Sequence, residues 1–407
     1  MIFLILEKNK VEKFNKTAIK TFFDEDFNTK DKTEKLIDNI LFMKELDVKQ
    51  YTLYKKYLEL QTYREQYIKA VNIKDRIWRP TDFNNEELTI KEINELKPKI
   101  FLVDNESVYK DSWLLLRVFG HTMEFDANPG RFLKFLVIDE VMNKYLGVVS
   151  VGSDVTAIAV RDKYIGWTRD DKFKKHKLNH SAIGTCIMAL QPFGYNFLGG
   201  KLIASLLTTD VIRNIWEEKY GETLVGMSTT SLYGSASMYN NIPWWRKMGS
   251  SQGKIIIKPD DDIYKEWLDW LREEHRDVYT KLTRTESGRV ATSPKQNVLK
   301  YIFKQTHANF KEQNLAHGFQ RGVYYSLFYE NGCEFFRDEI KEDELKLKEK
   351  FTNNYDKIIE WWKPKAINRY KKLQEENRLK PEIHFYDDII GKTWEDTEEK
   401  YLKEVGR

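Results

Sequence analysis

The feature that most constrains this chain is a set of short, β-rich apolar runs in its middle third. After Pro98 the sequence changes to runs at 100–103, 132–138 and 146–151, rich in Val, Ile, Leu and Phe. Gly, Asn, Asp and Pro separate these runs, and such residues favour tight connections between strands. The pattern therefore predicts a sheet built from closely connected strands.

The same region continues with alternating helix and strand signals. A further apolar run at 184–190 leads to Gly199-Gly200, which opens an amphipathic helical pattern that reaches Trp216. A cation and a glycine at Lys219-Tyr220-Gly221 are typical of a helix end. Later apolar runs at 224–228 and 253–258 predict two more strands.

The regions on both sides are charged and have helical spacing. In the segment 53–60, for example, apolar residues recur every three or four positions. We therefore predict the α+β class, with a central mixed, twisted sheet flanked by helical regions. The expected division is a mostly helical N-terminal region at 1–98, an α/β core at 99–259 and a C-terminal helical region at 260–407.

Composition excludes several kinds of protein. The 67 Lys and Arg nearly cancel the 63 Asp and Glu, leaving a formal charge of +4. Nucleic-acid binding would therefore need a local basic patch. Cys186 and Cys333 lie far apart in the sequence, so we do not expect a disulfide framework. We expect instead that the protein works in a reducing compartment. No apolar run is long enough for a membrane-spanning helix, so we expect a cytoplasmic protein without membrane partners.

Several common catalytic and metal-binding motifs are missing. His176 and His180 are four residues apart, but no cysteine or carboxylate lies at a spacing diagnostic of a metal site, so none is predicted. The sequence also has no Walker phosphate loop, no paired CxxC and no serine nucleophile elbow. An ATPase or a hydrolase of the usual kinds is disfavoured.

An ordered series of motifs resembles the Druantia defence protein A family over about the middle third of the chain. The motifs are Tyr145–Ser153, Arg161-Asp162 with Ile165-Gly166-Trp167, Asn179–Ile183, the helix from Gly199, Leu224–Met227 and Tyr233–Trp245. Such a core is similar in fold to the GNAT acyltransferases and to the phage Mom proteins, which acylate adenine in DNA. This second likeness is an analogy of fold, which by itself does not establish function.

The resemblance implies a cofactor near the strand that ends at about Leu190, with an acyl-CoA or another acyl donor as the expected group. Small residues at a helix start let backbone N–H groups approach a phosphate. The expected cofactor-binding residues are Leu198, Gly199, Gly200 and Lys201. The loop 191–200 matches the acyltransferase pattern only loosely, and the two glycines would also serve as a tight turn.

The resemblance also implies a place for acid and base chemistry. Acyltransferases of this kind place a tyrosine general acid and small polar residues where Tyr233–Tyr239 lies, and a carboxylate would act as base. The candidate catalytic residues are Tyr239, Ser235, Ser237 and Asp162, with Asp154 as an alternative base. Arg161 and Asp162 would equally form a structural ion pair at the end of a strand.

Two basic segments are candidates for nucleic-acid contact, because cations beside aromatic rings suit a phosphate backbone with stacked bases. The expected residues are Arg169, Lys172, Lys174, Lys175, Trp244 and Arg246. A solvated basic loop and a tryptophan buried in the core explain the same residues without any ligand.

Three hypotheses follow. The first is an acyltransferase-fold enzyme that modifies bases in DNA, in a phage or a defence island. The second is a DNA-binding subunit of an anti-phage defence system or mobile element, without catalysis. The third is an interaction protein whose charged helical flanks dock protein partners.

Overall fold

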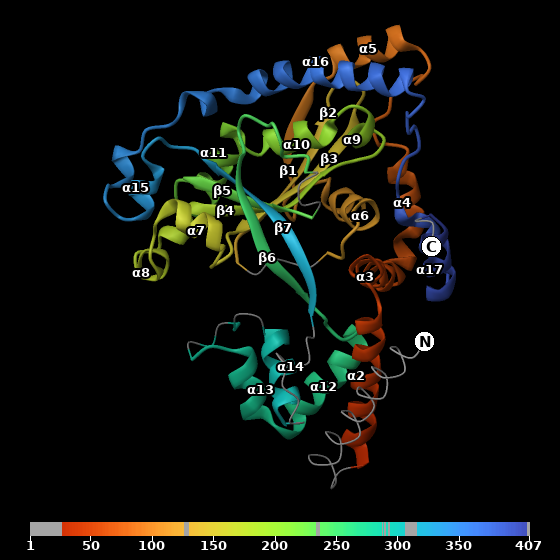
Figure 1. The fold of residues 1–407 in the computed structure, drawn as a ribbon, viewed down its shortest axis with the longest axis vertical. Helices are drawn as coiled ribbons and strands as arrows, with labels where there is room; N and C mark the ends of the chain where they lie inside the picture. Colours follow the sequence, from red (N-terminus) through yellow and green to blue (C-terminus); the bar gives the residue numbers. More distant parts are fainter. Residues whose placement is uncertain are drawn as a thin grey trace, which may run out of the picture. The chain divides into compact units, whose positions relative to one another are not determined.

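The computed structural model describes residues 27–125, 130–232, 237–286, 288, 290–291, 294–305 and 316–404. It contains a mixed seven-stranded sheet with helices on both faces, which confirms the predicted α+β class (Figure 1). The order of the strands across the sheet is β1-β2-β3-β4-β5-β7-β6. The strands are β1 (Pro98–Leu102), β2 (Phe132–Asp139), β3 (Lys144–Ser153), β4 (Ser181–Ala189), β5 (Gly226–Ser231), β6 (Arg246–Ile256) and β7 (Ala316–Leu327).

The pair β4 and β5 is parallel, whereas β1 to β4 pair in antiparallel fashion and β5 is antiparallel to β7. The parallel register extends only from Ser181 opposite Gly226 to Gly184 opposite Thr229. On its other side β4 stays paired with β3 as far as Ala189. The two parallel strands therefore separate in the second half of β4.

Helices connect and cover these strands. The α-helices are α2 (Phe27–Glu45), α3 (Val48–Thr62), α4 (Tyr67–Lys74), α5 (Glu86–Glu95), α6 (Lys110–Gly120), α7 (Ala159–Ile165), α8 (Arg169–Phe173), α9 (Phe193–Asn196), α10 (Gly199–Leu206), α11 (Asp210–Tyr220), α12 (Asp261–Glu274), α13 (Arg276–Thr283), α14 (Pro294–Gln305), α15 (Gly332–Phe336), α16 (Asn354–Glu375) and α17 (Trp394–Glu404). Short 3-10 helices lie at Arg64–Gln66, Lys177–His180, Glu342–Glu344, Glu349–Phe351 and Tyr386–Ile389.

Each face of the sheet has its own apolar core, because side chains alternate along a strand. Leu133, Phe135 and Val137 of β2 pack in the cluster that contains α10, α11 and α16. Leu136 of β2 and Cys186 of β4 pack in the other cluster, with residues of α4 and α6. The middle of the sheet is thus buried on both sides.

The chain divides into two compact units that are not continuous in sequence. Residues 52–252 and 320–407 form one, and residues 1–51 and 253–319 form the other. The division into three consecutive regions, 1–98, 99–259 and 260–407, stays a prediction from sequence. In the smaller unit α12 packs on α2 and α13. There the Asn39 side chain donates to Asp260 Oδ2 at 2.7 Å and accepts from the Asp260 N–H at 3.0 Å.

Two local features differ from the sequence expectations. The segment 316–327, which falls in the region expected to be helical, is strand β7. The helix expected from 201 to 216 is two helices, α10 and α11. Thr208 and Thr209 end the first helix by donating their hydroxyls to the carbonyls of Ser205 and Leu206 at 2.7 Å, a side-chain bond that competes with helix continuation.

Among the described residues, no helix has both the length and the apolar character needed to cross a membrane.

Candidate functional site

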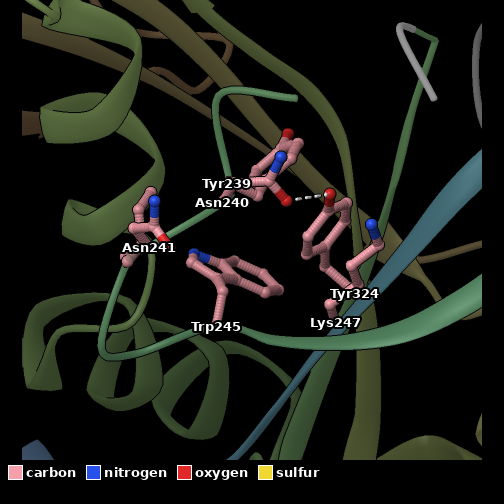
Figure 2. A pocket seen from close by; sticks show the side chains of 7 residues that line it. Tyr239, Asn240, Asn241, Trp245, Lys247 and Tyr324 are labelled. Carbon is pink, nitrogen blue, oxygen red and sulfur yellow. Dashed lines mark hydrogen bonds between the residues drawn. The ribbon is translucent and has the colours of Figure 1, made fainter. Parts of the chain in front are cut away.

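A pocket of about 410 Å³ lies beside the segment that links β5 to β6 (Figure 2). Its walls are aromatic rings, side-chain amides and one ammonium group. The lining residues are Tyr239, Asn240, Asn241, Ile242, Trp245, Lys247 and Tyr324. Lys247 comes from β6 and Tyr324 from β7, and the others come from the linking segment.

The pocket rings hold one another in place. The Tyr239 ring lies 5.0 Å from the Tyr324 ring and 5.7 Å from the Trp245 ring, between centroids. The Tyr324 hydroxyl donates to Asn240 Oδ1 at 2.8 Å, the dashed line in Figure 2. These contacts fix the orientation of one amide and three aromatic planes.

The start of α10 anchors the linking segment. Lys201 Nζ donates to the carbonyls of Met238, at 3.1 Å, and of Asn240. The Trp245 indole N–H donates to the Ala204 carbonyl at 2.8 Å. Because these bonds satisfy backbone carbonyls on both elements, the pocket wall is tied to a buried helix.

Tyr239, the first choice for a general acid, faces this pocket but is itself 5% exposed. Burial raises the pKa of its hydroxyl well above the usual value for tyrosine, although a hydrogen bond with Thr229 lowers it in part. The two hydroxyl oxygens are 3.3 Å apart. The phenol is therefore protonated at neutral pH.

The small polar candidates lie just before Tyr239. Ser237 is buried, and its Oγ accepts a hydrogen bond from the Tyr239 N–H at 3.2 Å. Ser235 lies outside the described residues. The contact made by Ser237 shapes the local turn, and its catalytic assignment stays a prediction.

The expected cofactor-binding residues form a closely packed helix start. A Cβ on Gly199 would lie 2.3 Å from the Phe193 ring, and a Cβ on Gly200 would lie 2.8 Å from Met238 Sδ. The Trp362 indole N–H also donates to the carbonyls of Phe197 and Leu198, at 3.0 and 3.2 Å.

These neighbours do not fit a pyrophosphate at this helix start, because side chains already occupy the space above both glycines. Gln191 of the preceding loop also uses its Oε1 to accept the Tyr195 N–H at 2.9 Å. The assignment of Leu198, Gly199, Gly200 and Lys201 to a cofactor stays a prediction from sequence.

Asp162 belongs to a buried polar network and not to the pocket lining. Its Oδ1 accepts hydrogen bonds from Arg161 Nε at 2.9 Å and from the Trp167 indole at 2.9 Å. Its Oδ2 accepts from Lys172 Nζ at 2.7 Å. Burial alone would raise the pKa of Asp162, but the bonds from Lys172, Arg161 and Trp167 together lower it.

Asp154, the alternative base, lies in the same network. Arg161 NH1 is 2.7 Å from Asp154 Oδ1, and both side chains are fully buried. The hydroxyls of Ser228 and Ser181 donate to the two carboxylate oxygens at 2.6 and 2.5 Å. This arrangement is a paired, hydrogen-bonded buried charge, which is a structural use of a carboxylate.

The network and the pocket lie on opposite faces of β5. Ser228 contacts Asp154, whereas the next residue, Thr229, contacts Tyr239. Successive side chains of a strand point to opposite sides. The structure therefore does not bring Asp162 or Asp154 together with Tyr239.

Carboxylates neutralise the basic stretch around α8. Lys172 pairs with Asp162, Lys174 with Asp170, and Lys175 with both Asp171 and Asp338. Hydrogen bonds to Asp171 and Asp338 raise the pKa of Lys175. Arg169 is exposed, with its guanidinium 5.9 Å from the centroid of the Phe173 ring.

The second basic segment combines a core residue with an exposed one. Trp244 is buried, donates its indole N–H to the Lys350 carbonyl at 2.9 Å and packs edge-on against Trp361. Arg246 is exposed, with its guanidinium 4.6 Å from the centroid of the Tyr164 ring. Contact of these side chains with nucleic acid stays a prediction.

Sequence reasoning did not identify Asn240, Asn241, Ile242 and Tyr324 as site residues, whereas Trp245 and Lys247 lie in the segment 244–247, whose rings and cations suggest nucleic-acid contact. A signal existed for Tyr324, because the aromatic run 317–325 stands out in the sequence and fits no helical period. The described residues contain no group of three or more His, Cys, Asp or Glu that would hold a metal ion.

The fold and this site define a class: an α+β protein with a pocket of aromatic, amide and ammonium groups beside a sheet in which the described strands include one parallel pair. The family model "Druantia protein DruA" matches residues 52–338. The chain belongs to this family.

A curated relative is the Druantia protein DruA of Escherichia coli (strain UMEA 4076-1). It is 29% identical over 276 residues, which cover 62% of this chain and 65% of the relative. The match therefore spans somewhat less than two thirds of the relative's length. No solved structure matches.

Proposed function

We propose that this chain is a nucleic-acid-binding component of a Druantia anti-phage defence system, and that its pocket receives a nucleobase. The lining of the pocket carries the proposal. Aromatic rings offer stacking surfaces, amides offer donors and acceptors to the edge of a base, and an ammonium group suits a phosphate. Membership in the DruA family supports the defence context.

The pocket favours a planar, polar ligand over a purely apolar one. Asn240 and Tyr324 are tied together by a hydrogen bond, so one edge of the pocket is polar and fixed. Trp245 and Tyr239 present ring surfaces next to it. A base that is stacked on a ring and hydrogen-bonded at its edge satisfies both features.

The test is nucleic-acid binding by the full chain, with an Asn240→Asp variant. The new carboxylate still accepts from the Tyr324 hydroxyl, but it replaces the amide donor with an acceptor and adds a negative charge. We expect binding of fluorescent oligonucleotides to weaken by about tenfold, as for the loss of one good base contact. Plaque counts on cells that carry the variant should rise with the loss of binding.

The matched control is Asn84→Asp, the same substitution at an exposed loop position away from the pocket lining. It should bind as the wild type does. Equal binding by wild type, Asn240→Asp and Asn84→Asp would contradict a base in this pocket. Failure of the wild type to bind any nucleic acid would contradict the proposed function as a whole.

A second candidate is group transfer to a nucleobase, in line with the resemblance to GNAT acyltransferases and Mom proteins. One observation favours it. The parallel strands β4 and β5 separate after Gly184, and the protonated Tyr239 hydroxyl lies by Thr229, the last residue of β5 that pairs with β4. Tyr239 is the group that would supply a proton there. The packed start of α10 argues against an acyl-CoA at that helix.

Nucleoside mass spectrometry separates the two candidates. DNA from cells that express the wild type would be compared with DNA from cells that express Tyr239→Phe, which keeps the ring contacts and removes the hydroxyl. A mass shift seen only with the wild type supports base modification. No shift in either sample, together with retained DNA binding, supports the binding component.

A further inference from the structure

Cations from segments distant in sequence gather around the segment that links β5 to β6. We name this group the cation cluster: Lys201, Arg246, Lys247, Lys348, Lys350 and Lys365. Lys201 Nζ donates to the carbonyls of Met238 and Asn240, and Lys350 Nζ donates to the Pro243 carbonyl at 3.0 Å. Lys247 lines the pocket itself.

Helix α16 adds a member of the cluster. The Trp361 ring of α16 lies 5.3 Å from the Trp244 ring, between centroids. Lys365, one turn further along α16, places its Nζ 5.2 Å from the centroid of the Trp361 ring. Burial lowers the pKa of Lys201, and the charge of Lys365 lowers it further.

Lys348, Lys350 and Arg246 also act on one another through their charges. Burial lowers the pKa of Lys350, and the charge of Lys348 adds to the effect. Burial likewise lowers the pKa of Lys348, with Arg246 as a further cause that acts against the opposing effect of Glu330. Like charges thus act on one another within this group, and each disfavours the charged form of its neighbour.

Glu330 acts to raise the pKa of Lys348 and Lys350, but it forms no salt bridge with either lysine. Across the parts of the chain that the structure describes, no member of the cation cluster forms an ion pair with Asp or Glu. The lysines in and just after α8 differ, because Lys172, Lys174 and Lys175 all have carboxylate partners. Cations that form no salt bridge within the chain are suited to an anion from outside it.

We propose that the cation cluster holds the phosphate backbone of a single-stranded nucleic acid while one of its bases occupies the pocket. This inference rests on the proposed function and names its substrate class. A pocket lined by Tyr239, Trp245 and Tyr324 requires a base free of its neighbours, and a single strand provides one without the cost of opening a duplex. Phosphates on either side of that base then lie where the cations are.

The experiment measures binding of the full chain to a fluorescent DNA single strand and to the duplex of the same sequence, over a series of KCl concentrations. The test variant is Arg246→Gln combined with Lys247→Gln and Lys365→Gln. These three side chains are exposed. Lys201 and Lys350 stay in place because they bond to backbone carbonyls that hold the pocket wall.

The control variant removes equal charge elsewhere: Lys69→Gln combined with Lys91→Gln and Lys403→Gln. Each of these lysines is at least 66% exposed and paired with a carboxylate. We expect the test variant to bind the single strand about tenfold or more weakly. The slope of its plot of log affinity against log salt should be smaller in magnitude by about 2. Each of the three lost phosphate contacts on a single strand reduces this slope by roughly 0.7. The control should match the wild type.

Each outcome separates the inference from the proposed function. Equal losses in the test and control variants would overturn the cation cluster as the backbone site and leave nucleic-acid binding intact. A wild type that prefers the duplex would overturn the single-stranded substrate class. A wild type that binds neither form would overturn both proposals. Loss of single-strand binding in the test variant only, with unchanged circular dichroism, supports the inference.

Discussion

At the scale of single residues, the structure separates candidates that the sequence placed together. Tyr239 could be predicted as a site residue because its segment is rich in aromatic and small polar residues. Its partner Tyr324 is 85 positions away, and only the pairing of β5 with β7 brings the two together. The local sequence likewise shows the lysines in and just after α8. It does not show that Asp338, which follows α15, pairs with Lys175. Residue types predict chemistry, whereas the tertiary fold decides which charges remain unpaired.

Arg161 is the residue whose loss should cost the most stability. Its guanidinium is fully buried between Asp154 and Asp162, so replacement by Met leaves Asp154 buried without a counterion. We expect Arg161→Met to lower the free energy of unfolding by about 3 to 5 kcal/mol, measured by urea denaturation. The double variant with Asp154→Asn should recover part of this loss. A cost below about 1 kcal/mol for the single variant would show that the pair is not effectively desolvated.

The same network predicts how stability depends on pH. The pKa of Asp162 is lower in the folded chain than in the unfolded one, so its ionised form stabilises the fold above the unfolded pKa of about 4. This contribution is lost as the pH falls through the lower folded value. We expect the stability difference between wild type and Asp162→Asn to be constant near neutral pH and to shrink below about pH 4. Urea denaturation at several pH values measures it, and a difference independent of pH would refute the assignment.

At the scale of elements, short apolar runs were enough to predict strands β1 to β5 and the onset of α10. Strand β7 could not be predicted in this way, because its Gly and polar residues at 317–322 break the apolar alternation on which such a prediction depends. The break between α10 and α11 was missed as well. It depends on two threonine hydroxyls that compete for backbone carbonyls, and the apolar period continues across them.

The first residues of α10 are tightly packed, so substitution of its two glycines by alanine should lower stability by different amounts. Gly199→Ala would place a methyl group 2.3 Å from the rigid Phe193 ring, whereas Gly200→Ala would meet the flexible Met238 side chain at 2.8 Å. We expect Gly199→Ala to cost about 1 to 3 kcal/mol of stability and Gly200→Ala to cost less. Thermal melts followed by circular dichroism measure both. Phe193→Leu should rescue Gly199→Ala, and the absence of rescue would point away from packing as the cause.

At the scale of the whole molecule, the near-zero charge balance conceals a strong local asymmetry. Acidic residues neutralise Lys172, Lys174 and Lys175, whereas the members of the cation cluster, which form no ion pair within the described residues, come from α10, β6, the segment around Lys350 and α16. A net charge of +4 does not reveal this distribution. Only the folded chain shows where the positive surface lies.

Cys186 offers a test of the cooperativity of the larger unit. It lies in β4, is 3% exposed, and burial raises the pKa of its thiol despite the nearby charges of Arg117 and Lys56. Only the thiolate reacts readily, so in a Cys333→Ser variant Cys186 should be labelled by a disulfide reagent only as the sheet unfolds. Labelling across a urea series should follow the loss of circular dichroism. Rapid labelling without denaturant would show that the sheet opens locally.

The unit boundaries within β6 and β7 have a consequence for the design of variants. Residues 253–319 are an insertion between two neighbouring strands, and no residue that lines the pocket belongs to it. A variant in which this segment is replaced should therefore keep all the residues that line the pocket. In such a chimera, β6 and β7 would be the strands at which the exchange is made.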